Sequence, residues 1–217
     1  MPKIKIVPAI LSANPKTVNE DVKQVEPYSD LLQVDIMDNV FVPNATRQAE
    51  QLKTLKTKLP LDIHLMVKEP SEKYIMGFIK ANPRLKINNI TVHYEACSNP
   101  GKMLDFIRKN NIKAGIAINP KTSLEKITEF LDKADMVLVM TVEPGFSGQE
   151  FIKEALSKVS KLRKSKPNID IEVDGGINDR TGAMAARAGA NMFVANSYVF
   201  KAEDKIIAIK KLRAAVE

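Results

Sequence analysis

Three short segments of the chain alternate between apolar and polar residues, which is the pattern of a β-strand whose two faces differ. They span residues 32–37, 61–67 and 169–174. The polar face carries Gln33 and Asp35 in the first segment, His64 in the second, and Glu172 and Asp174 in the third. If helices cover the apolar faces, these side chains converge inside the molecule. Carboxylates and an imidazole gathered there predict a metal site or an acid–base site.

Apolar, β-branched runs alternate with helical stretches along the whole chain. We predict strands over 4–10, 30–37, 61–67, 87–93, 114–118, 136–140, 169–174 and 192–196. We predict helices over 16–28, 45–58, 71–81, 101–110, 123–132, 149–165, 180–188 and 203–215. Strict alternation of strands and helices indicates the α/β class with a parallel sheet. Eight repeats in 217 residues match a single (β/α)8 barrel domain over 1–217.

The composition agrees with a globular chain of this kind. Apolar residues make up 44% of the sequence, enough to bury a sizeable core. No apolar run approaches the roughly 18 residues of a membrane span, and the first residues lack the apolar stretch of a secretory signal. The one cysteine, Cys97, has no partner for an internal disulfide, and we interpret it as a small packing residue. We therefore expect a protein of the reducing cytoplasm that has no membrane partner.

The formal net charge is +7, and the lysines fall mostly on the predicted helices and at their ends. Tryptophan is absent and no series of aromatic residues accompanies the lysines, so a platform for stacking nucleic-acid bases is not indicated. We therefore expect no nucleic-acid partner. A diffuse positive field of this kind favours the capture of an anionic substrate.

In the predicted barrel, the polar faces of the strands all point toward the interior. Active sites of such barrels lie at the C-terminal ends of the strands. Asp35, His64 and Asp174 stand near the ends of their strands, so we expect them to meet at that rim. Three further acidic residues come earlier on the same faces, and we expect them to serve in buried hydrogen bonds or ion pairs: Asp62, Asp170 and Glu172.

Loops that contain glycine or small polar residues follow three of the predicted strands. Gly175 and Gly176 close the seventh strand, where glycine lets the backbone approach an anion. The helix that follows is expected to offer free N–H groups and the positive end of its dipole. Asn196 and Ser197 follow the eighth strand, and the loop 144–149 follows the sixth. Since the loops after strands seven and eight are the usual phosphate site of these barrels, we predict a phosphate-bearing ligand.

Five motifs resemble, in the same order, the signatures of the ribulose-phosphate 3-epimerase family. They are PAILSA (8–13), VDIMD (34–38) with FVPN (41–44), DIHLMV (62–67), VMTVEPGFSGQ (139–149) and EVDGGI (172–177). The resemblance implies a barrel that interconverts D-ribulose 5-phosphate and D-xylulose 5-phosphate in the pentose phosphate pathway. It also implies one divalent metal ion (zinc, iron, manganese or similar), a ketose phosphate substrate and a homo-oligomer.

The same resemblance implies roles for individual residues. Asp35 and Asp174 are the acid and base that exchange a proton on the carbon next to the ketone, through a metal-stabilised enediolate. Asp35, His64 and Asp174 hold the metal, with Gln33 at the position of a fourth ligand. The implied substrate-binding residues are Ser12, Met37, His64, Met66, Met140, Gly145, Phe146, Ser147, Gly148, Gly175, Gly176, Asn196 and Ser197. The three methionines either cover the intermediate against water or only pack the core.

The chain departs from the family pattern at several positions. Gln33 stands where the family has a histidine, and an amide oxygen is a poorer ligand than imidazole for zinc or iron. The other changes are Asn39-Val40 for Gly-His, Arg47-Gln48 for an apolar residue and Gly, and Asn196 for Gly. Asn39 and Asn196 are compatible with these sites because asparagine tolerates left-handed backbone geometry. Gln33 permits a weaker or harder metal, low activity without a metal, or no epimerase activity.

Three hypotheses follow from the sequence. The first is a ribulose-phosphate 3-epimerase with an atypical metal site. The second is a related 3-epimerase of a hexulose phosphate such as allulose 6-phosphate, with altered specificity in the loop 38–48. The third is a degenerate or engineered barrel that binds sugar phosphates or serves as a scaffold. Retention of Asp35 and Asp174 argues against the third, because buried carboxylates are costly to keep without a role.

Overall fold

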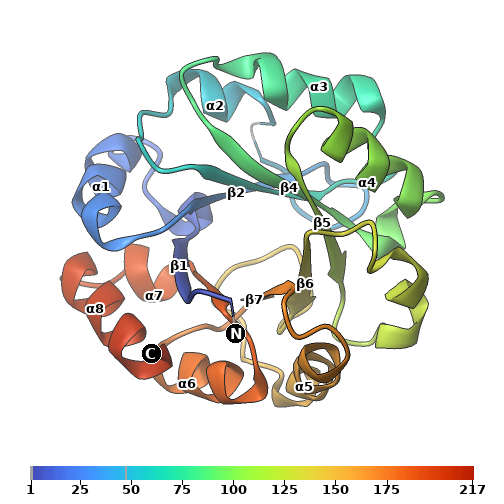
Figure 1. Ribbon diagram of the computed structural model, residues 1–217. Helices are drawn as coiled ribbons and strands as arrows, with labels where there is room; N and C mark the ends of the chain where they lie inside the picture. Colours follow the sequence, from blue (N-terminus) through green and yellow to red (C-terminus); the bar gives the residue numbers. More distant parts are fainter. Residues whose placement is uncertain (1, 47) are drawn as a thin grey trace.

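Eight parallel strands form one sheet that closes into a barrel (Figure 1). The computed structural model describes residues 2–46 and 48–217. The strands are β1 (Lys5–Pro8), β2 (Leu32–Met37), β3 (Leu61–Met66), β4 (Ile87–His93), β5 (Lys113–Ile118), β6 (Met136–Met140), β7 (Asp170–Asp174) and β8 (Met192–Ala195). Their order is β1-β8-β7-β6-β5-β4-β3-β2, and a parallel bridge between Ala9 and Gln33 joins the two ends of this order. The predicted (β/α)8 barrel is therefore confirmed.

Helices surround the barrel (Figure 1). They are α1 (Val18–Val25), α2 (Glu50–Thr54), α3 (Glu72–Ala81), α4 (Pro100–Lys109), α5 (Leu156–Ser165), α6 (Asp179–Ala188), α7 (Ser197–Phe200) and α8 (Lys205–Val216). Short 3₁₀ helices cover Ile10–Ser12, Glu26–Tyr28, Tyr94–Ala96, Leu124–Phe130 and Lys153–Ala155. None of the helices in the described part of the chain has the length and apolarity needed to cross a membrane.

Four of the predicted helices were wrong in extent or type. Among the described residues of 45–58 the structure has the short helix α2, because an antiparallel bridge between Asp38 and Ala45 and a hydrogen bond from the Thr46 amide to the Met37 carbonyl hold the start of the segment extended. The prediction 123–132 is a 3₁₀ helix. The helix predicted from 149 begins only at Lys153, because the Gln149 side chain closes the preceding loop on the carbonyls of Glu143 and Phe146. The end of the prediction 16–28 is 3₁₀, and α7 was not predicted.

The alternation of the strands separates two environments. Leu32, Val34 and Ile36 are fully buried in the large apolar cluster between the sheet and the helices. Gln33 and Asp35, on the other face of β2, are buried as well but form hydrogen bonds across the barrel interior. The interior is thus polar in the middle, and burial of these groups depends on their pairing with one another.

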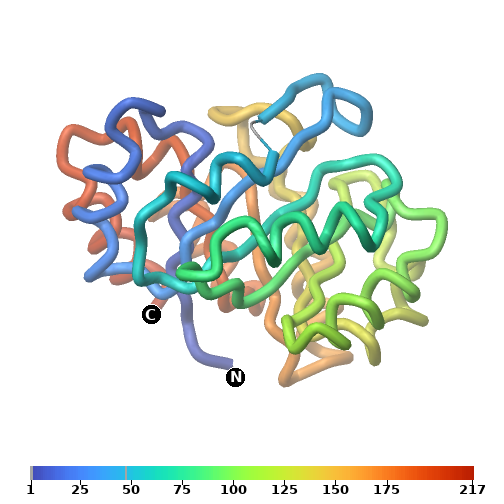
Figure 2. The backbone as a smooth tube through the Cα atoms, turned by 90° about the horizontal axis from the view of Figure 1, so that it is seen from above, coloured from blue at the N-terminus to red at the C-terminus, as the bar shows by residue number. Residues whose placement is uncertain are grey.

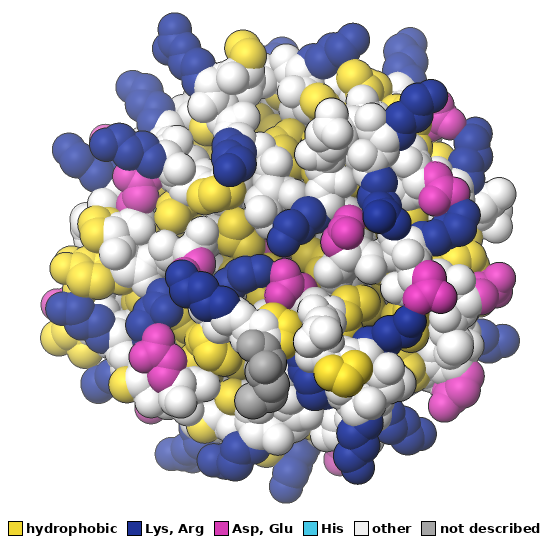
Figure 3. All heavy atoms as spheres, in the orientation of Figure 1, with side chains coloured by type: hydrophobic (Ala, Val, Ile, Leu, Met, Phe, Trp, Pro, Cys, Tyr) yellow, Lys and Arg dark blue, Asp and Glu magenta, His cyan; other side chains and the backbone are white. Residues whose placement is uncertain are grey.

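The two ends of the barrel differ. Figure 2 shows the segments after β2 and β6 rising at one end, while both termini lie at the other. At the end with the termini, Lys5 Nζ lies 2.6 Å from Asp170 Oδ2, which is the ion pair expected for that acidic residue. Figure 3 views this end and shows Lys and Arg spread over it with Asp and Glu among them, in agreement with a diffuse charge.

Candidate active site

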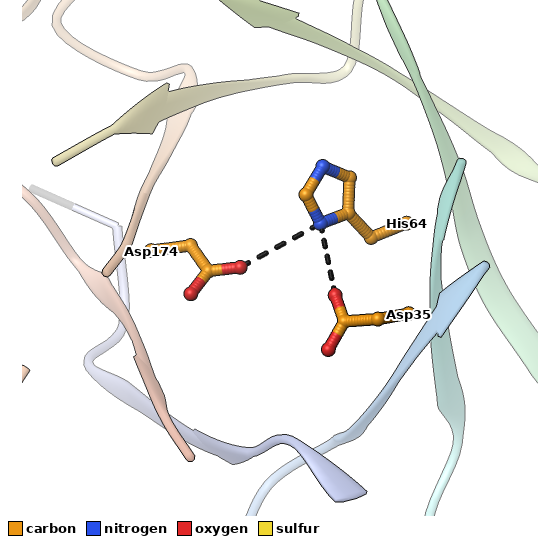
Figure 4. A group of neighbouring side chains, drawn as sticks. All are labelled: Asp35, His64 and Asp174. Carbon is orange, nitrogen blue, oxygen red and sulfur yellow. Dashed lines mark hydrogen bonds and ion pairs between the residues drawn. The ribbon is translucent and has the colours of Figure 1, made fainter. Parts of the chain in front are cut away.

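Asp35, His64 and Asp174 converge inside the barrel, toward the C-terminal ends of their strands (Figure 4). His64 Nδ1 lies 3.1 Å from Asp35 Oδ1 and 3.5 Å from Asp174 Oδ2. The candidate ligand atoms of the three residues all lie within 4.8 Å of one another. The residues come from β3, β2 and β7, and parallel register places Asp35 directly beside His64. The sequence therefore placed these three side chains together correctly.

Gln33 belongs to the same cluster. Its Nε2 donates hydrogen bonds to Asp35 Oδ1 at 2.9 Å and to Asp174 Oδ2 at 2.8 Å. Its Oε1 is buried and has no hydrogen-bond partner within the described chain. A half turn of the carboxamide would aim Oε1 at the two carboxylates, and a cation between them would make that arrangement favourable. The donor set therefore fits a divalent cation with three oxygen ligands and one nitrogen ligand.

The charges of this cluster are coupled through burial. Burial opposes the protonated form of His64, but hydrogen bonds and charge from Asp174 and Asp35 outweigh it and raise the pKa of His64 to about 9. Burial also raises the pKa of Asp35, and the nearby charge of Asp174 adds to that effect. A divalent cation would take the place of the His64 Nδ1 proton between the same carboxylates.

A cavity of about 640 Å³ opens above this cluster. The predicted site residues that line it are Asp35, Met37, Met66, Met140, Gly145, Phe146, Ser147, Gly148, Asp174, Gly175, Gly176, Asn196 and Ser197. Gln33 and His64 are fully buried and do not line the cavity. Ser12 also lies outside the lining, but its Oγ is 3.0 Å from Ser147 Oγ and its backbone N–H donates to Asn196 Oδ1 at 2.8 Å.

The three methionines form part of the cavity wall. Met37, Met66 and Met140 are all buried and lie at the ends of β2, β3 and β6. The loop after β6 lines the cavity as well, and a hydrogen bond of 2.7 Å from Asn44 Nδ2 to the carbonyl of Gly145 joins it to the loop after β2. Their burial in the wall agrees with both interpretations, core packing and exclusion of water from the cavity, so the covering role stays a prediction.

The turn after β7 has room only for glycine. Gly175 has a φ of +118°, and a Cβ there would lie 2.4 Å from Val142 Cγ2. The prediction of free N–H groups at the start of the following helix α6 was wrong for two of them. The Asn178 side chain accepts hydrogen bonds from the amides of Arg180 and Thr181. An anion at this turn would therefore meet the backbone of the glycine turn and the dipole of α6, and those two amides would not take part.

Sequence reasoning missed His93, the other histidine of the chain. It is fully buried at the end of β4, and its Nε2 lies 2.9 Å from Nε2 of His64. The signal was present, since Asn89, Thr91 and His93 alternate with apolar residues as the polar faces of the other strands do. Missed cavity-lining residues with polar side chains are Glu150, Lys153, Thr181 and Tyr198.

Comparison with known proteins identifies relatives over almost the whole chain. The ribulose-phosphate 3 epimerase family matches residues 5–200. The chain is 39% identical over 220 residues to a ribulose-phosphate 3-epimerase of Bacillus subtilis, covering 98% of this chain and 99% of that protein. It is 40% identical over 222 residues to the enzyme of the same name from Schizosaccharomyces pombe, covering 100% and 95%.

A solved structure of a 3-hexulose-6-phosphate synthase shares the fold. It superposes with a TM-score of 0.73 at 20% identity, covering 99% of this chain and all of that one. This likeness concerns the barrel alone, whereas the sequence matches extend to the motifs of the rim. The chain therefore belongs to the ribulose-phosphate 3-epimerase family of isomerases.

Proposed function

We propose that this barrel interconverts D-ribulose 5-phosphate and D-xylulose 5-phosphate. The observation that carries the proposal is the pair of carboxylates, Asp35 on β2 and Asp174 on β7, that reach the floor of one cavity from different sides of the barrel. Inversion at a carbon next to a ketone needs a base on one face of the sugar and an acid on the other. These two side chains supply both from strands that do not neighbour each other.

In the proposed reaction, one aspartate removes the proton from the carbon next to the ketone. The electron pair of the broken C–H bond forms the carbon–carbon double bond of an enediolate, and negative charge moves onto the former ketone oxygen. The other aspartate, in its protonated form, then returns a proton to the opposite face. Burial and the nearby charge of Asp174 raise the pKa of Asp35, which favours its protonated form over that of an ordinary aspartate.

The remaining residues hold the ligand and the charge. Asp35, His64, Asp174 and the amide oxygen of Gln33 would hold a divalent cation, whose charge would stabilise the enediolate. The oxygen-rich set favours a hard ion such as manganese over zinc. Gly175, Gly176 and Ser197 would receive the substrate phosphate at the edge of the cavity, where the exposed Lys153 adds positive charge.

The test is turnover of D-ribulose 5-phosphate by protein stripped of metal and then supplied with zinc, iron or manganese. The proposal predicts metal-dependent turnover, with manganese at least as effective as zinc. The Gln33→His variant is expected to shift the preference toward zinc and iron. If neither protein turns over with any metal, the proposal is wrong, and a six-carbon ketose phosphate is the next substrate to assay. Light scattering on the same sample tests the homo-oligomer that we also propose.

A further inference from the structure

The two histidines of the chain face each other inside the barrel. Nε2 of His64 and Nε2 of His93 lie 2.9 Å apart, and the rings are inclined by only 25°. Both side chains are fully buried. Two lone pairs at this distance would repel each other, and two N–H groups would collide, so one of the two nitrogens carries the proton and the other accepts it.

The surroundings of the other ring nitrogen of His93, Nδ1, determine which of the two Nε2 atoms carries the proton. Its Nδ1 lies 3.4 Å from Glu95 Oε2. Both atoms are buried, and the side-chain oxygen of Asn119, which is also buried and can only accept, faces His93 as well. An ionised carboxylate only accepts hydrogen bonds. The proton of a neutral His93 therefore belongs on Nδ1, toward Glu95, and its Nε2 presents a lone pair to His64.

Glu95 is fixed in this orientation from its other side. Its Oε1 accepts the backbone N–H of Asn119 at 2.8 Å and the hydroxyl of Thr122. The loop that carries these donors is clamped in turn by Lys158 of α5, whose Nζ donates to the carbonyls of Asn119, Pro120 and Thr122 at 2.7, 2.8 and 2.8 Å. Two donors therefore occupy one oxygen of Glu95 and leave the other for His93.

The pair is also closed toward the solvent. Phe41, from the loop after β2, packs its ring over His93 with 4.9 Å between the ring centres. At such a buried place a mismatched pair of donors or acceptors is costly, which makes the choice of tautomer strict.

We propose that Glu95, acting through His93, fixes His64 as a donor at Nε2 and so reserves its Nδ1 lone pair for a divalent cation between Asp35 and Asp174. Glu95 and His93 are positioning residues in this scheme, since neither reaches the cavity lining. The inference rests on the proposed function for the identity of the bound group. The assignment of the His64 and His93 tautomers does not depend on the proposed function.

The first test uses the fact that the chain has only two histidines. In protein labelled with ¹⁵N-histidine, a long-range ¹H–¹⁵N spectrum contains two ring systems, and a His93→Phe variant assigns them. We expect neutral His93 protonated at Nδ1, and His64 protonated at Nε2 both without metal and with zinc bound. His93 protonated at Nε2 would overturn the proposal, whatever the enzymatic activity of the sample.

The second test reverses the direction of the hydrogen bonds that run from Glu95 through His93 to His64. In Glu95→Gln, the donors of Asn119 and Thr122 retain the amide oxygen on their side, so the NH₂ group faces His93 Nδ1. The proton of His93 then moves to Nε2, and His64 must become the Nδ1–H tautomer. We expect both ring systems to switch in the spectrum and zinc affinity, measured by calorimetry, to fall about 10- to 100-fold.

A matched control is Glu69→Gln, because Glu69 accepts two hydrogen bonds from Ser98 in the neighbouring loop and has no histidine contact. It should leave the tautomers and the zinc affinity unchanged. Unchanged tautomers in a folded Glu95→Gln protein would refute the proposal that Glu95 sets the tautomer of His64 through His93. If Glu95→Gln does not fold, the spectrum of the unmodified protein alone decides. Absence of epimerase activity would count against the proposed function and leave this result standing.

Discussion

The inner face of β7 carries three acidic residues at three depths of the barrel, and their environments differ. At the cavity, Asp174 contacts His64 and the amide of Gln33. One layer below, Glu172 is fully buried, and neither of its carboxyl oxygens meets the criteria for a hydrogen bond in the described structure. Burial and the adjacent carboxyl of Asp62 raise the pKa of Glu172 well above its usual range.

Asp170, at the end with the termini, has ordinary structural partners. Its carboxylate accepts from Lys5 at 2.6 Å and from the Asn191 side chain at 2.8 Å. One alternating pattern thus places one acidic residue beside His64 at the cavity, one in the buried middle of the barrel with a raised pKa, and one in an ion pair at the end with the termini. The comparison teaches that alternation decides which face a side chain occupies, whereas depth along the barrel axis decides what it does there.

The largest expected effect is the difference in kcat/KM between a substitution at Asp174, beside the cavity, and one at Glu172, in the middle of the barrel. Asp174→Asn removes the proposed proton-transfer group, which is also a proposed cation ligand, so kcat/KM should fall at least about 1000-fold. Glu172→Gln replaces a carboxyl group, whose raised pKa favours the uncharged form, by an amide of the same size on the same strand and face, so kcat/KM should change by less than about threefold. Steady-state kinetics of both variants on D-ribulose 5-phosphate measures the difference. Equal losses would show that the two layers act as one unit.

The sequence was a reliable guide to the strands because each is a short apolar or alternating run between helical or polar stretches. The bounds 87–93 and 136–140 agree with β4 and β6. The loop after β2 was misread as helix because its shape depends on hydrogen bonds such as those of Asp38, which composition does not reveal. Arg47, part of the unusual Arg47-Gln48 pair, lies outside the described residues.

The site was predictable only in its outline. Alternation and strand ends brought Asp35, His64 and Asp174 together, since parallel strands end at one rim. The partner of His64 was not predictable in the same way. Whether His93 meets His64 depends on the register between β3 and β4, which shifts between Leu61 and Asp62. A one-residue change of register moves every side chain to the other face.

A second prediction compares two glycines, one at the catalytic rim and one in the lower interior. A Cβ at Gly175 would lie 2.4 Å from Val142 Cγ2 with φ at +118°, and a Cβ at Gly115 would lie 2.2 Å from Thr91 Oγ1. Each change to alanine should lower the free energy of unfolding by about 1–3 kcal/mol. Only Gly175→Ala should also lower kcat/KM, because it shifts the turn that carries Asp174.

Urea denaturation gives the stability of both alanine variants, and active-site titration normalises their activity to folded protein. An additional reference is Gly77→Ala, since Gly77 lies within α3 and a Cβ there meets no atom within 4 Å. It should raise stability by about 0.5–1 kcal/mol. A loss of kcat/KM in Gly115→Ala as large as in Gly175→Ala would contradict the separation of the two layers.

The smallest expected effect concerns the end of the barrel with the termini. Burial opposes the charge of Asp30, but hydrogen bonds from the Ile6 amide and from Arg213 outweigh it and lower the pKa of Asp30. A carboxylate whose pKa is lower in the folded state stabilises the fold above its unfolded pKa, near 3.9, and loses this contribution as the pH falls through the folded value.

Asp30→Asn keeps an acceptor for the Ile6 amide but removes the charge opposite Arg213. We expect it to lower the free energy of unfolding by about 1–2 kcal/mol at pH 7, since the pair is partly exposed. The difference in free energy of unfolding between the variant and the unmodified protein should become smaller as the pH falls from 5 to 3, as measured by urea denaturation. The kcat/KM per folded molecule should stay the same. A difference that is constant with pH would mean that Asp30 acts through shape alone. A loss of activity would mean that the two ends of the barrel are coupled, because nothing at Asp30 touches the cavity.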